Sequence, residues 1–296
     1  MRTMNLLVTL DENYLPPLCV LLKSIFINNP EERFRVYMIY DSIRAESVEN
    51  LSRFCAFHGS ELYPITAREE LFSDAPVTAR LPRAMDYRLL ARYLLPEDLG
   101  RILYLDPDII VINPLRELYD TDFGGALYAG ASHTGITGVK ETVNKVRLQN
   151  YELSGYINPG VLLLNLGRRR AELRREDIFR YIAEHRHQLI LPDQDILNGL
   201  YADRTLLLDD SLYNYDARRY EVYRIASEGV KDLDWVMENT VILHFCGKAK
   251  PWDKTNRNRF GLLYKHYASM AAKTNAAPYL QPPGDKEARY AYTENP

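Results

Sequence analysis

Two aspartates interrupt an apolar run near the middle of the chain, in the sequence Leu-Tyr-Leu-Asp-Pro-Asp-Ile-Ile-Val at residues 103–111. Residues two apart in an extended backbone project to the same side, so the carboxylates of Asp106 and Asp108 can converge on one point. Two buried like charges that close require a cation, and a divalent ion that bridges them to a diphosphate meets this requirement. The alternative is an Asp-Pro-Asp turn with solvated carboxylates.

A histidine follows a second apolar run, and a basic loop follows the histidine. His244 ends the run Val-Ile-Leu-His, and Gly247, Lys248 and Lys250 lie between it and a Pro-Trp pair. A neutral imidazole can complete a carboxylate metal site, and lysine ammonium groups match phosphate oxygens. A structural histidine beside a solvated basic turn is the alternative, which explains the lysines but not the adjacent histidine.

Two further polar motifs have chemistry to offer. Asp193, Gln194 and Asp195 stand at a predicted helix start, where Asp193 can serve simply as the N-cap. Asn158-Pro159-Gly160 opens into an apolar run at 161–164 and by itself predicts a turn followed by a strand.

Alternating segments in the first half of the chain must position these groups. Compact apolar runs predict strands at 5–10, 34–40, 61–65 and 101–105, and helices are expected between them at 14–26, 44–58 and 83–95. This order is typical of an open, doubly wound α/β sheet, which binds ligands at the carboxyl ends of its strands, where Asp11, Asp41 and Asp106 lie. The less regular second half predicts strands at 126–132, 161–165, 205–209 and 241–245, and helices at 176–187 and 194–201.

Composition limits the class of protein. The 296 residues are 46% hydrophobic and 26% charged, as in a globular protein with a core, and the net charge of −3 argues against a nucleic-acid partner. One domain is expected over residues 1–275, followed by an irregular, proline-containing tail at 276–296.

The cysteines and the N-terminus indicate the compartment. Cys19, Cys55 and Cys246 are odd in number and far apart, so they predict free thiols, with neither a disulfide framework nor a paired zinc spacing. Neither a secretory signal nor a transmembrane segment is recognisable, which favours a cytoplasmic protein.

Taken together, the motifs resemble the retaining glycosyltransferases of family 8, which include lipopolysaccharide galactosyltransferases, general-stress-protein-like enzymes and glycogenin. Six segments match in the family's order, and they run from near the N-terminus to about residue 252. These segments are 9–14, 87–90, 103–108, 158–165, 193–198 and 244–252. The resemblance implies a GT-A-type single domain, in which a Rossmann-like, nucleotide-binding mixed sheet is flanked by helices and the C-terminal part is irregular.

The resemblance also implies a UDP-sugar donor and a role for each motif. Manganese, with magnesium as the alternative, would be held by Asp106, Asp108 and His244. The uridine pocket would comprise Thr9, Asp11, Asn13 and Tyr14, with Tyr14 stacking on the base. The donor sugar would be surrounded by Arg88, Asp106, Asn158, Asp193 and Gln194. Gly247 and Lys250 would contact the diphosphate.

The implied reaction is transfer of a hexose, galactose or glucose, to a hydroxyl acceptor with retention of configuration. The metal would act as a Lewis acid on the departing UDP, with assistance from Lys250. Retaining glycosidases use a carboxylate nucleophile. Here the side chain nearest that position is Gln194, a feeble nucleophile, which favours front-face attack. Asp193 or Asp195 as a covalent nucleophile is the alternative.

The acceptor side departs from the lipopolysaccharide enzymes. Some of these carry an aspartate where Thr134 stands here, which counts against a lipopolysaccharide acceptor; the expected acceptor is a saccharide or glycolipid. The tail lacks a basic cluster, so at most weak peripheral membrane contact is expected. The arginines at 168–170, with Arg174 and Arg175, are interpreted as a solvated helix start, with a lipid-binding site as the alternative.

Two other functions compete with the transferase, and the oligomeric state stays open. One is a protein that binds a nucleotide sugar without turning it over. Against it, all four side chains expected to bind the metal and the phosphates are present, namely Asp106, Asp108, His244 and Lys250. The other is a metal-dependent phosphohydrolase of the haloacid-dehalogenase type built on Asp-Pro-Asp, although Ile110 occupies the position where those enzymes carry threonine.

Overall fold

The computed structural model describes residues 2–67, 83–133, 155–185 and 187–274 of the chain. The expected tail at 276–296 and Thr134 lie outside these residues. Strands form two sheets, a larger one of seven strands and a smaller one of three. The larger sheet comprises β1 (Thr3–Thr9), β2 (Arg33–Tyr40), β3 (Glu61–Thr66), β4 (Arg101–Leu105), β6 (Tyr128–Ser132), β7 (Ile157–Asn165) and β8 (Thr205–Leu208).

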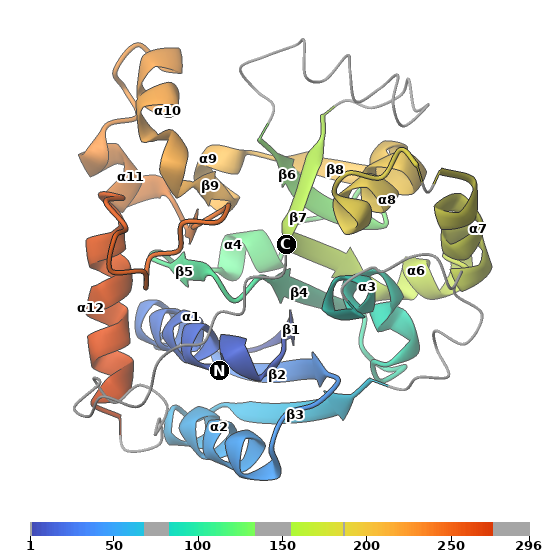
Figure 1. Ribbon diagram of the computed structural model, residues 1–296, viewed down its shortest axis with the longest axis horizontal. Helices are drawn as coiled ribbons and strands as arrows, with labels where there is room; N and C mark the ends of the chain where they lie inside the picture. Colours follow the sequence, from blue (N-terminus) through green and yellow to red (C-terminus); the bar gives the residue numbers. More distant parts are fainter. Residues whose placement is uncertain (1, 68–82, 134–154, 186, 275–296) are drawn as a thin grey trace.

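The larger sheet is mixed, with the order β3-β2-β1-β4-β7-β6-β8. Strands β3, β2, β1 and β4 pair in parallel, β7 runs antiparallel to both of its neighbours, and β8 pairs in parallel with β6. Figure 1 shows this order from β3 beside α2 at one edge to β8 at the other. The predicted mixed α/β sheet is therefore confirmed.

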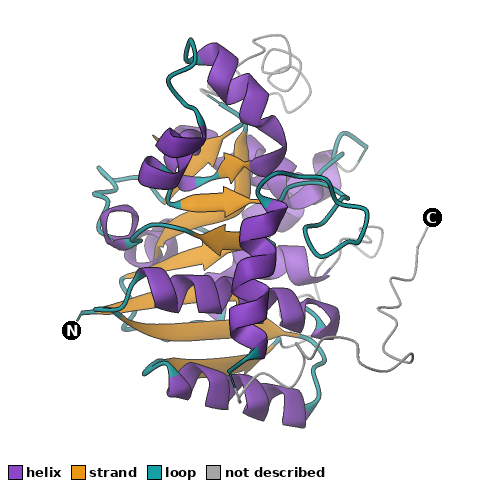
Figure 2. Cartoon of the chain, turned by 90° about the vertical axis from the view of Figure 1, so that its left-hand side faces the viewer, coloured by secondary structure: helices purple, strands orange, loops and turns teal. Residues whose placement is uncertain are grey.

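Helices cover this sheet on both sides, as Figure 2 shows. The helices of the described residues are α1 (Leu15–Asn28), α2 (Ala45–Phe57), α3 (Arg83–Leu90), α4 (Arg116–Tyr119), α6 (Leu166–Glu172), α7 (Arg175–His185), α8 (Pro192–Tyr201), α9 (Asp210–Tyr213), α10 (Tyr220–Ala226), α11 (Leu233–Asn239) and α12 (Gly261–Ala272), of which α10, α11 and α12 pack with the smaller sheet. Short 3-10 turns occupy Glu12–Tyr14, Ala91–Tyr93, Ala202–Arg204 and Ala217–Arg219.

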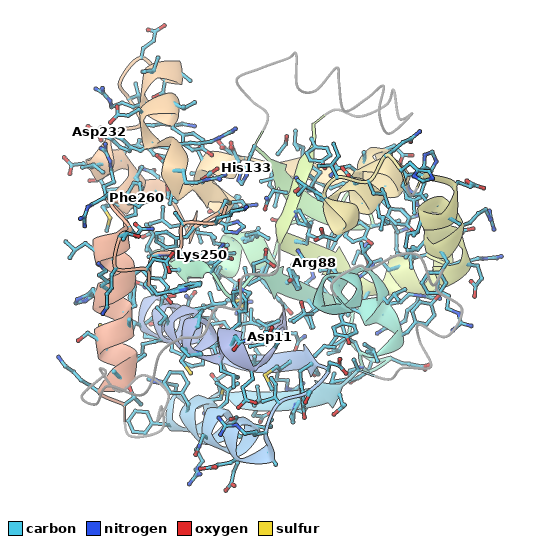
Figure 3. All side chains as sticks on the ribbon, in the orientation of Figure 1. Asp11, Arg88, His133, Asp232, Lys250 and Phe260 are labelled. Carbon is cyan, nitrogen blue, oxygen red and sulfur yellow. The ribbon has the colours of Figure 1, made fainter. Side chains whose placement is uncertain are left out.

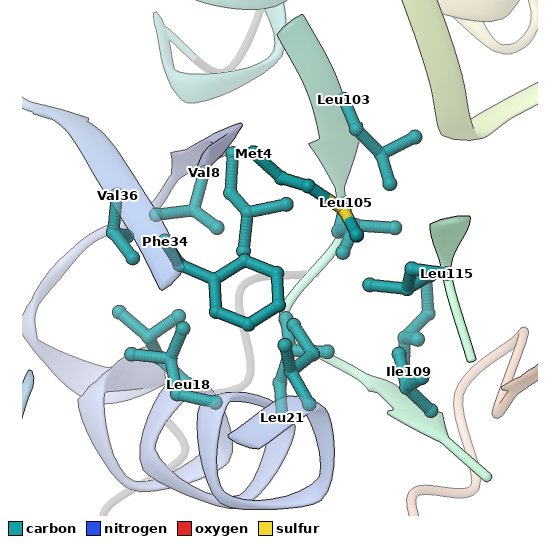
Figure 4. Packing of buried hydrophobic residues seen from close by; sticks show 14 of the residues in the cluster. Met4, Val8, Leu18, Leu21, Phe34, Val36, Leu103, Leu105, Ile109 and Leu115 are labelled. Carbon is teal, nitrogen blue, oxygen red and sulfur yellow. The ribbon is translucent and has the colours of Figure 1, made fainter. Parts of the chain in front are cut away.

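The strands are apolar on both faces, and each face has its own core. Leu6 and Val8 belong to one buried cluster, whereas Leu7 belongs to another, because successive side chains of a strand point to opposite faces. Helices α1 and α2 contribute to the first cluster, part of which Figure 4 shows around Phe34 and Leu18. Helices α3, α7 and α8 contribute to the second cluster. Burial on both faces explains the continuous apolar runs in the sequence.

The smaller sheet was only partly predicted. It has the order β5-β10-β9, formed by β5 (Ile109–Val111), β10 (Ile242–His244) and β9 (Tyr215–Asp216). Strand β10 pairs antiparallel with β5 and parallel with β9. A third buried cluster joins this sheet to α12 and, through Val20, to α1. These strands are two or three residues long, too short to give a period-2 pattern.

Some predicted boundaries differ from the structure. The helix expected at 83–95 ends at Leu90 and continues as one 3-10 turn, Ala91–Tyr93. The arginine run at 168–170 was interpreted as a solvated helix start, and this is wrong for Arg169, which is completely buried. Its guanidinium donates to the carbonyl of Leu89 at the end of α3 and stacks over the ring of Tyr128, so the packing of α6 against α3 removes it from water.

Two further expectations concern cysteines and membranes. Cys19, Cys55 and Cys246 are all free and buried, as predicted. In the described part of the chain, none of the helices combines the length and the apolarity that crossing a bilayer requires.

Candidate active site

The Asp-Pro-Asp motif forms the connection between the two sheets. Asp106 follows β4 of the larger sheet, Pro107 and Asp108 form a turn, and β5 of the smaller sheet begins at once. The prediction of an extended backbone here is therefore wrong, because the chain has to turn where it passes from one sheet to the other. The carboxylate of Asp108 is nevertheless not solvated, since this residue is 7% exposed, and Asp106 is partly buried.

His244 lies opposite this turn because β10 pairs with β5. The ladder places His244 beside Ile109, the residue directly after Asp108. As a result, Nε2 of His244 lies 3.3 Å from Oδ1 of Asp108 and 4.0 Å from Oδ2 of Asp106. The structure thus brings together the three residues that were predicted as metal ligands.

The three side chains fit a divalent cation. One ligand atom from each of Asp106, Asp108 and His244 lies within 4.8 Å of the other two. Two carboxylates and an imidazole suit manganese or magnesium better than a soft metal. Gly160 keeps this space open, since a Cβ on it would overlap the His244 ring and lie 2.9 Å from Oδ2 of Asp106.

Asn214, which sequence reasoning missed, orients the histidine. Nδ1 of His244 lies 2.8 Å from the side-chain oxygen of Asn214, and the Asn214 amide donates to Oδ1 of Asn158 at 3.2 Å. The amide oxygen can only accept, so Nδ1 donates to it and Nε2 faces the carboxylates. Asn214 itself is fully buried. It precedes β9, and no local pattern in the sequence marks it.

Lys250 reaches the same carboxylates from the loop after β10. Its Nζ lies 2.5 Å from Oδ2 of Asp108 and donates to the carbonyl of Phe245 at 3.1 Å. Burial alone would raise the pKa of Asp108, but His244 and Lys250 outweigh it and hold this pKa well below its ordinary value. Asp108 is therefore a carboxylate over the physiological range, the form that binds metals.

Arg88 connects the turn to the start of α8. Its guanidinium lies 3.3 Å from Oδ1 of Asp106 and 3.5 Å from Oδ2 of Asp193, and it donates to the carbonyl of Pro159 at 3.0 Å. Burial raises the pKa of Asp193, although Arg88 counteracts the effect. Three of the predicted sugar-binding residues and the Pro159 carbonyl thus form one buried polar group.

A hydrogen-bonded tyrosine links this group to β1. The Tyr104 hydroxyl donates to Oδ1 of Asp106 at 2.6 Å and lies 3.2 Å from Oγ1 of Thr9. Sequence reasoning missed Tyr104. Its position in β4, two residues before Asp106, was the available signal, because alternate residues of a strand share a face.

The residues predicted to bind uridine lie at the carboxyl end of β1. Asp11 is exposed, and its Oδ1 accepts a hydrogen bond from the backbone N–H of Asn13. This bond caps the 3-10 turn that precedes α1. Tyr14 is half-buried, with its ring 6.2 Å from Trp252 in an edge-to-face arrangement. Figure 3 shows Asp11, Arg88 and Lys250 around the middle of the molecule.

The acidic residues of α8 differ in their surroundings. Asp195 is completely buried and accepts hydrogen bonds from the N–H groups of Ile190 and Leu191, at 2.6 and 2.9 Å, and from the Tyr156 hydroxyl. These contacts fix the backbone that leads into α8. Gln194, one residue earlier, is half-buried in the first turn.

The loop after β10 has a defined conformation. Gly247 has a φ of +85°, in the left-handed region that glycine adopts without strain. The backbone N–H of Lys250 donates to Oδ2 of Asp253 at 2.8 Å. The loop thus holds Lys250, predicted with Gly247 to contact the diphosphate, beside Asp108.

Comparison with known proteins defines the class. Residues 5–256 match the model of glycosyl transferase family 8. The chain therefore belongs to glycosyl transferase family 8, and it is a glycosyltransferase with the GT-A fold.

Several known proteins resemble it along most of its length. It is 24% identical to General stress protein A of Bacillus subtilis over 277 residues, covering 90% of this chain and 93% of that protein. It is 28% identical to a lipopolysaccharide 1,2-glucosyltransferase of Escherichia coli over 260 residues, covering 85% and 74%. The fold resembles the galactosyltransferase LgtC, solved with donor and acceptor sugar analogues, with a TM-score of 0.75, 24% identity and coverage of 90% and 96%.

Proposed function

We propose that this glycosyltransferase moves galactose or glucose from a UDP-sugar to a saccharide or other hydroxyl acceptor with retention of configuration. The observation that carries the proposal is the convergence of Asp106, Asp108 and His244, with Lys250 beside them. Related proteins whose names specify glucosyl and galactosyl transfer support a hexose, and the solved acceptor complex of LgtC supports a saccharide acceptor.

A divalent metal, manganese or magnesium, is the proposed cofactor. Asp106, Asp108 and His244 would hold it, and Asn214 would keep Nε2 of His244 directed at it. When bound, such an ion supplies Lewis-acid stabilisation of negative charge on a diphosphate.

The donor is proposed to lie across the carboxyl ends of β1 and β4. Thr9, Asp11, Asn13 and Tyr14 would surround the uridine. Arg88, Asp193, Gln194 and Asn158 would surround the sugar, and Asp106 would lie between sugar and ribose. Gly247 and Lys250 would contact the diphosphate, where the ammonium of Lys250 stabilises the charge that develops as the glycosidic bond breaks.

We favour front-face attack for the transfer. The bond from the anomeric carbon to the phosphate oxygen breaks, the acceptor oxygen bonds to that carbon, and the acceptor proton passes to the leaving phosphate oxygen. Gln194 is a feeble nucleophile. The carboxylate of Asp195 accepts three hydrogen bonds at the start of α8, which keep it from acting as a nucleophile. Asp193 remains the alternative nucleophile, paired with Arg88.

The test measures thermal stability with UDP, UDP-glucose and UDP-galactose, each with and without Mn²⁺. We expect a rise in melting temperature that requires nucleotide and metal together, because ligands that bind the folded state stabilise it. Asp108→Ala should abolish this rise and the transfer activity, whereas Asp234→Ala, at an exposed position of α11, should change neither. Retention of metal-dependent UDP binding by Asp108→Ala would contradict the site.

A second pair of variants separates the transferase from a phosphohydrolase. Asp11→Ala and Tyr14→Ala remove proposed contacts to uridine and should weaken UDP binding and transfer. Unchanged activity in both variants would favour hydrolysis of simple phosphoesters instead. Consumption of UDP-sugar by the unaltered protein with Mn²⁺ would rule out a binding protein without turnover.

A further inference from the structure

A second group of metal-binding side chains lies next to the candidate active site. One ligand atom from each of His133, Asp216 and Cys246 lies within 4.8 Å of the other two. The three residues come from different parts of the chain, the end of β6, the end of β9 and the residue after Phe245, which follows β10. The proposed transfer reaction uses none of them.

His133 is prepared to act as a ligand. Its Nε2 lies 2.5 Å from the backbone carbonyl of Asn214, which can only accept, so the proton is on Nε2 and Nδ1 carries the lone pair. A second hydrogen bond of this kind fixes the tautomer of most metal-bound histidines.

Cys246 supplies a soft ligand in a protected place. It is 8% exposed and lies two residues after His244 on the same loop. Thiolates select zinc and similar cations over manganese and magnesium, which prefer oxygen. The second group therefore has a different metal preference from the carboxylate-rich site beside it.

Asp216 completes the group and already has partners. It is fully buried, and Arg218 donates to its two oxygens at 2.9 and 2.7 Å. The backbone N–H of Arg218 also donates to Oδ1 at 3.0 Å, and Nε of Arg219 lies 3.6 Å from Oδ2, so Oδ2 is the oxygen that has capacity for a metal. A cysteine, a histidine and an aspartate are ligand types that zinc sites use.

We propose that His133, Asp216 and Cys246 form a second cation site, selective for a thiophilic divalent ion such as Zn²⁺. The site is close to the first one, because the rings of His133 and His244 are 6.5 Å apart and Asn214 contacts both histidines. A cation bound to Cys246 would shift the loop that follows it, which carries Gly247 and Lys250. Zinc is therefore expected to inhibit transfer, a consequence that rests on the proposed function, whereas the binding itself does not.

The experiment uses Co²⁺ as a spectroscopic substitute for zinc, added to the full chain in the presence of UDP and Mn²⁺. Thiolate bound to cobalt gives a charge-transfer absorption band that oxygen and nitrogen ligands do not give. We expect this band in the unaltered protein and in Cys55→Ala, whose thiol is buried elsewhere. Cys246→Ser should lose the band, and His133→Ala should weaken cobalt binding at least about tenfold, because even the loss of a group that only orients a ligand costs about 10–100-fold.

Three outcomes would overturn the site: absence of the band from the unaltered protein, its persistence in Cys246→Ser, or unchanged cobalt affinity in His133→Ala. The last result would mean that Cys246 serves the Asp106–Asp108 site instead. Mn²⁺-dependent stabilisation by UDP, measured on the same samples, reports separately on the proposed donor site. The transfer rate of each protein with zinc is then divided by its own rate without zinc. If Cys246→Ser and the unaltered protein are inhibited to the same extent, zinc bound at the second site does not inhibit transfer.

Discussion

Single side chains in the candidate site act through their neighbours as much as through direct contact. Asn214 shows this most clearly, since one residue contacts His244 and Asn158 with its amide and His133 with its carbonyl. Groups that orient a metal ligand affect metal affinity although they never contact the ion.

Asn214→Ala should therefore weaken Mn²⁺-dependent UDP binding about 10–100-fold, because the His244 ring loses the partner that fixes its tautomer and direction. Titration of Mn²⁺ at saturating UDP, followed by calorimetry, measures the loss. Asn239→Ala, whose amide only donates to the carbonyl of Trp235 at an exposed helix end, is the control and should bind as before. Equal affinity of the two variants would show that Asn214 has no orienting role.

Gly160 permits the close approach of the ligands. Gly160→Ala should abolish metal binding while the fold is kept, because the added methyl group would occupy the space between His244 and Asp106. Gly100→Ala is the matched control, since a Cβ there meets nothing within 4 Å. Metal titration and circular dichroism of both variants make the comparison. Normal metal affinity in Gly160→Ala would place the cation elsewhere.

At the residue scale, the proximity of Asp106, Asp108 and His244 could be expected from the sequence, because each stands at a border of an apolar run. Their role as metal ligands stays a prediction. Asn214 and the group of His133, Asp216 and Cys246 could not be predicted, because their proximity depends on β10 lying between β5 and β9. Such pairings between distant short strands leave no periodic signal in the sequence.

At the scale of elements, α1 and α2 pack together through a histidine. His58, at the end of α2, stacks on Phe26 of α1 at 4.8 Å and lies 3.3 Å from Nζ of Lys23. Burial, with the charge of Lys23, lowers the pKa of His58 from 6.5 to about 4. The unfolded chain therefore binds this proton more readily than the folded chain.

This shift has a consequence for stability against pH. As the pH falls from about 6.5 towards about 4, the unfolded state binds a proton on His58 that the folded state does not bind. The free energy of unfolding therefore decreases. His58→Phe keeps the stacking and removes the titration, so the stability lost between pH 7.5 and pH 5 should become smaller. Urea unfolding at the two pH values tests this, with exposed His266→Gln as control. An unchanged difference would contradict the assignment.

Elements were predicted well where apolar runs are long and buried on both faces, as in β1, β2 and β4. Boundaries were predicted less well, because tertiary contacts set them. The end of α3 is one example, where the carbonyl of Leu89 accepts from Arg169, 80 positions further along the chain. The GT-A architecture itself came from the order of six motifs and not from periodicity.

At the scale of the whole molecule, α1 connects the cores. Leu21 belongs to the core of the larger sheet, whereas the adjacent Val20 packs with the smaller sheet and α12. Figure 1 shows α1 beside both β5 and α12. The two sheets share a helix and are therefore expected to unfold together.

Leu21→Ala should lower the free energy of unfolding by about 2–5 kcal/mol, the usual cost of a large-to-small change in a packed core. Unfolding should remain a single transition when it is followed by fluorescence and circular dichroism together. The control is Leu262→Ala, whose side chain is 76% exposed and should change stability by less than about 0.5 kcal/mol. Two separate transitions would argue for two units and against the single domain expected from the sequence.

The pairing of β10 with β5 also determines when the site can exist. During synthesis the carboxylates of Asp106 and Asp108 leave the ribosome long before His244 is made, and β5 has no partner until β10 arrives. The smaller sheet therefore closes late, through contacts between distant parts of the chain, which form slowly. A chain that ends before β10 contains every strand of the larger sheet but lacks His244, so we expect it not to form the proposed cation site.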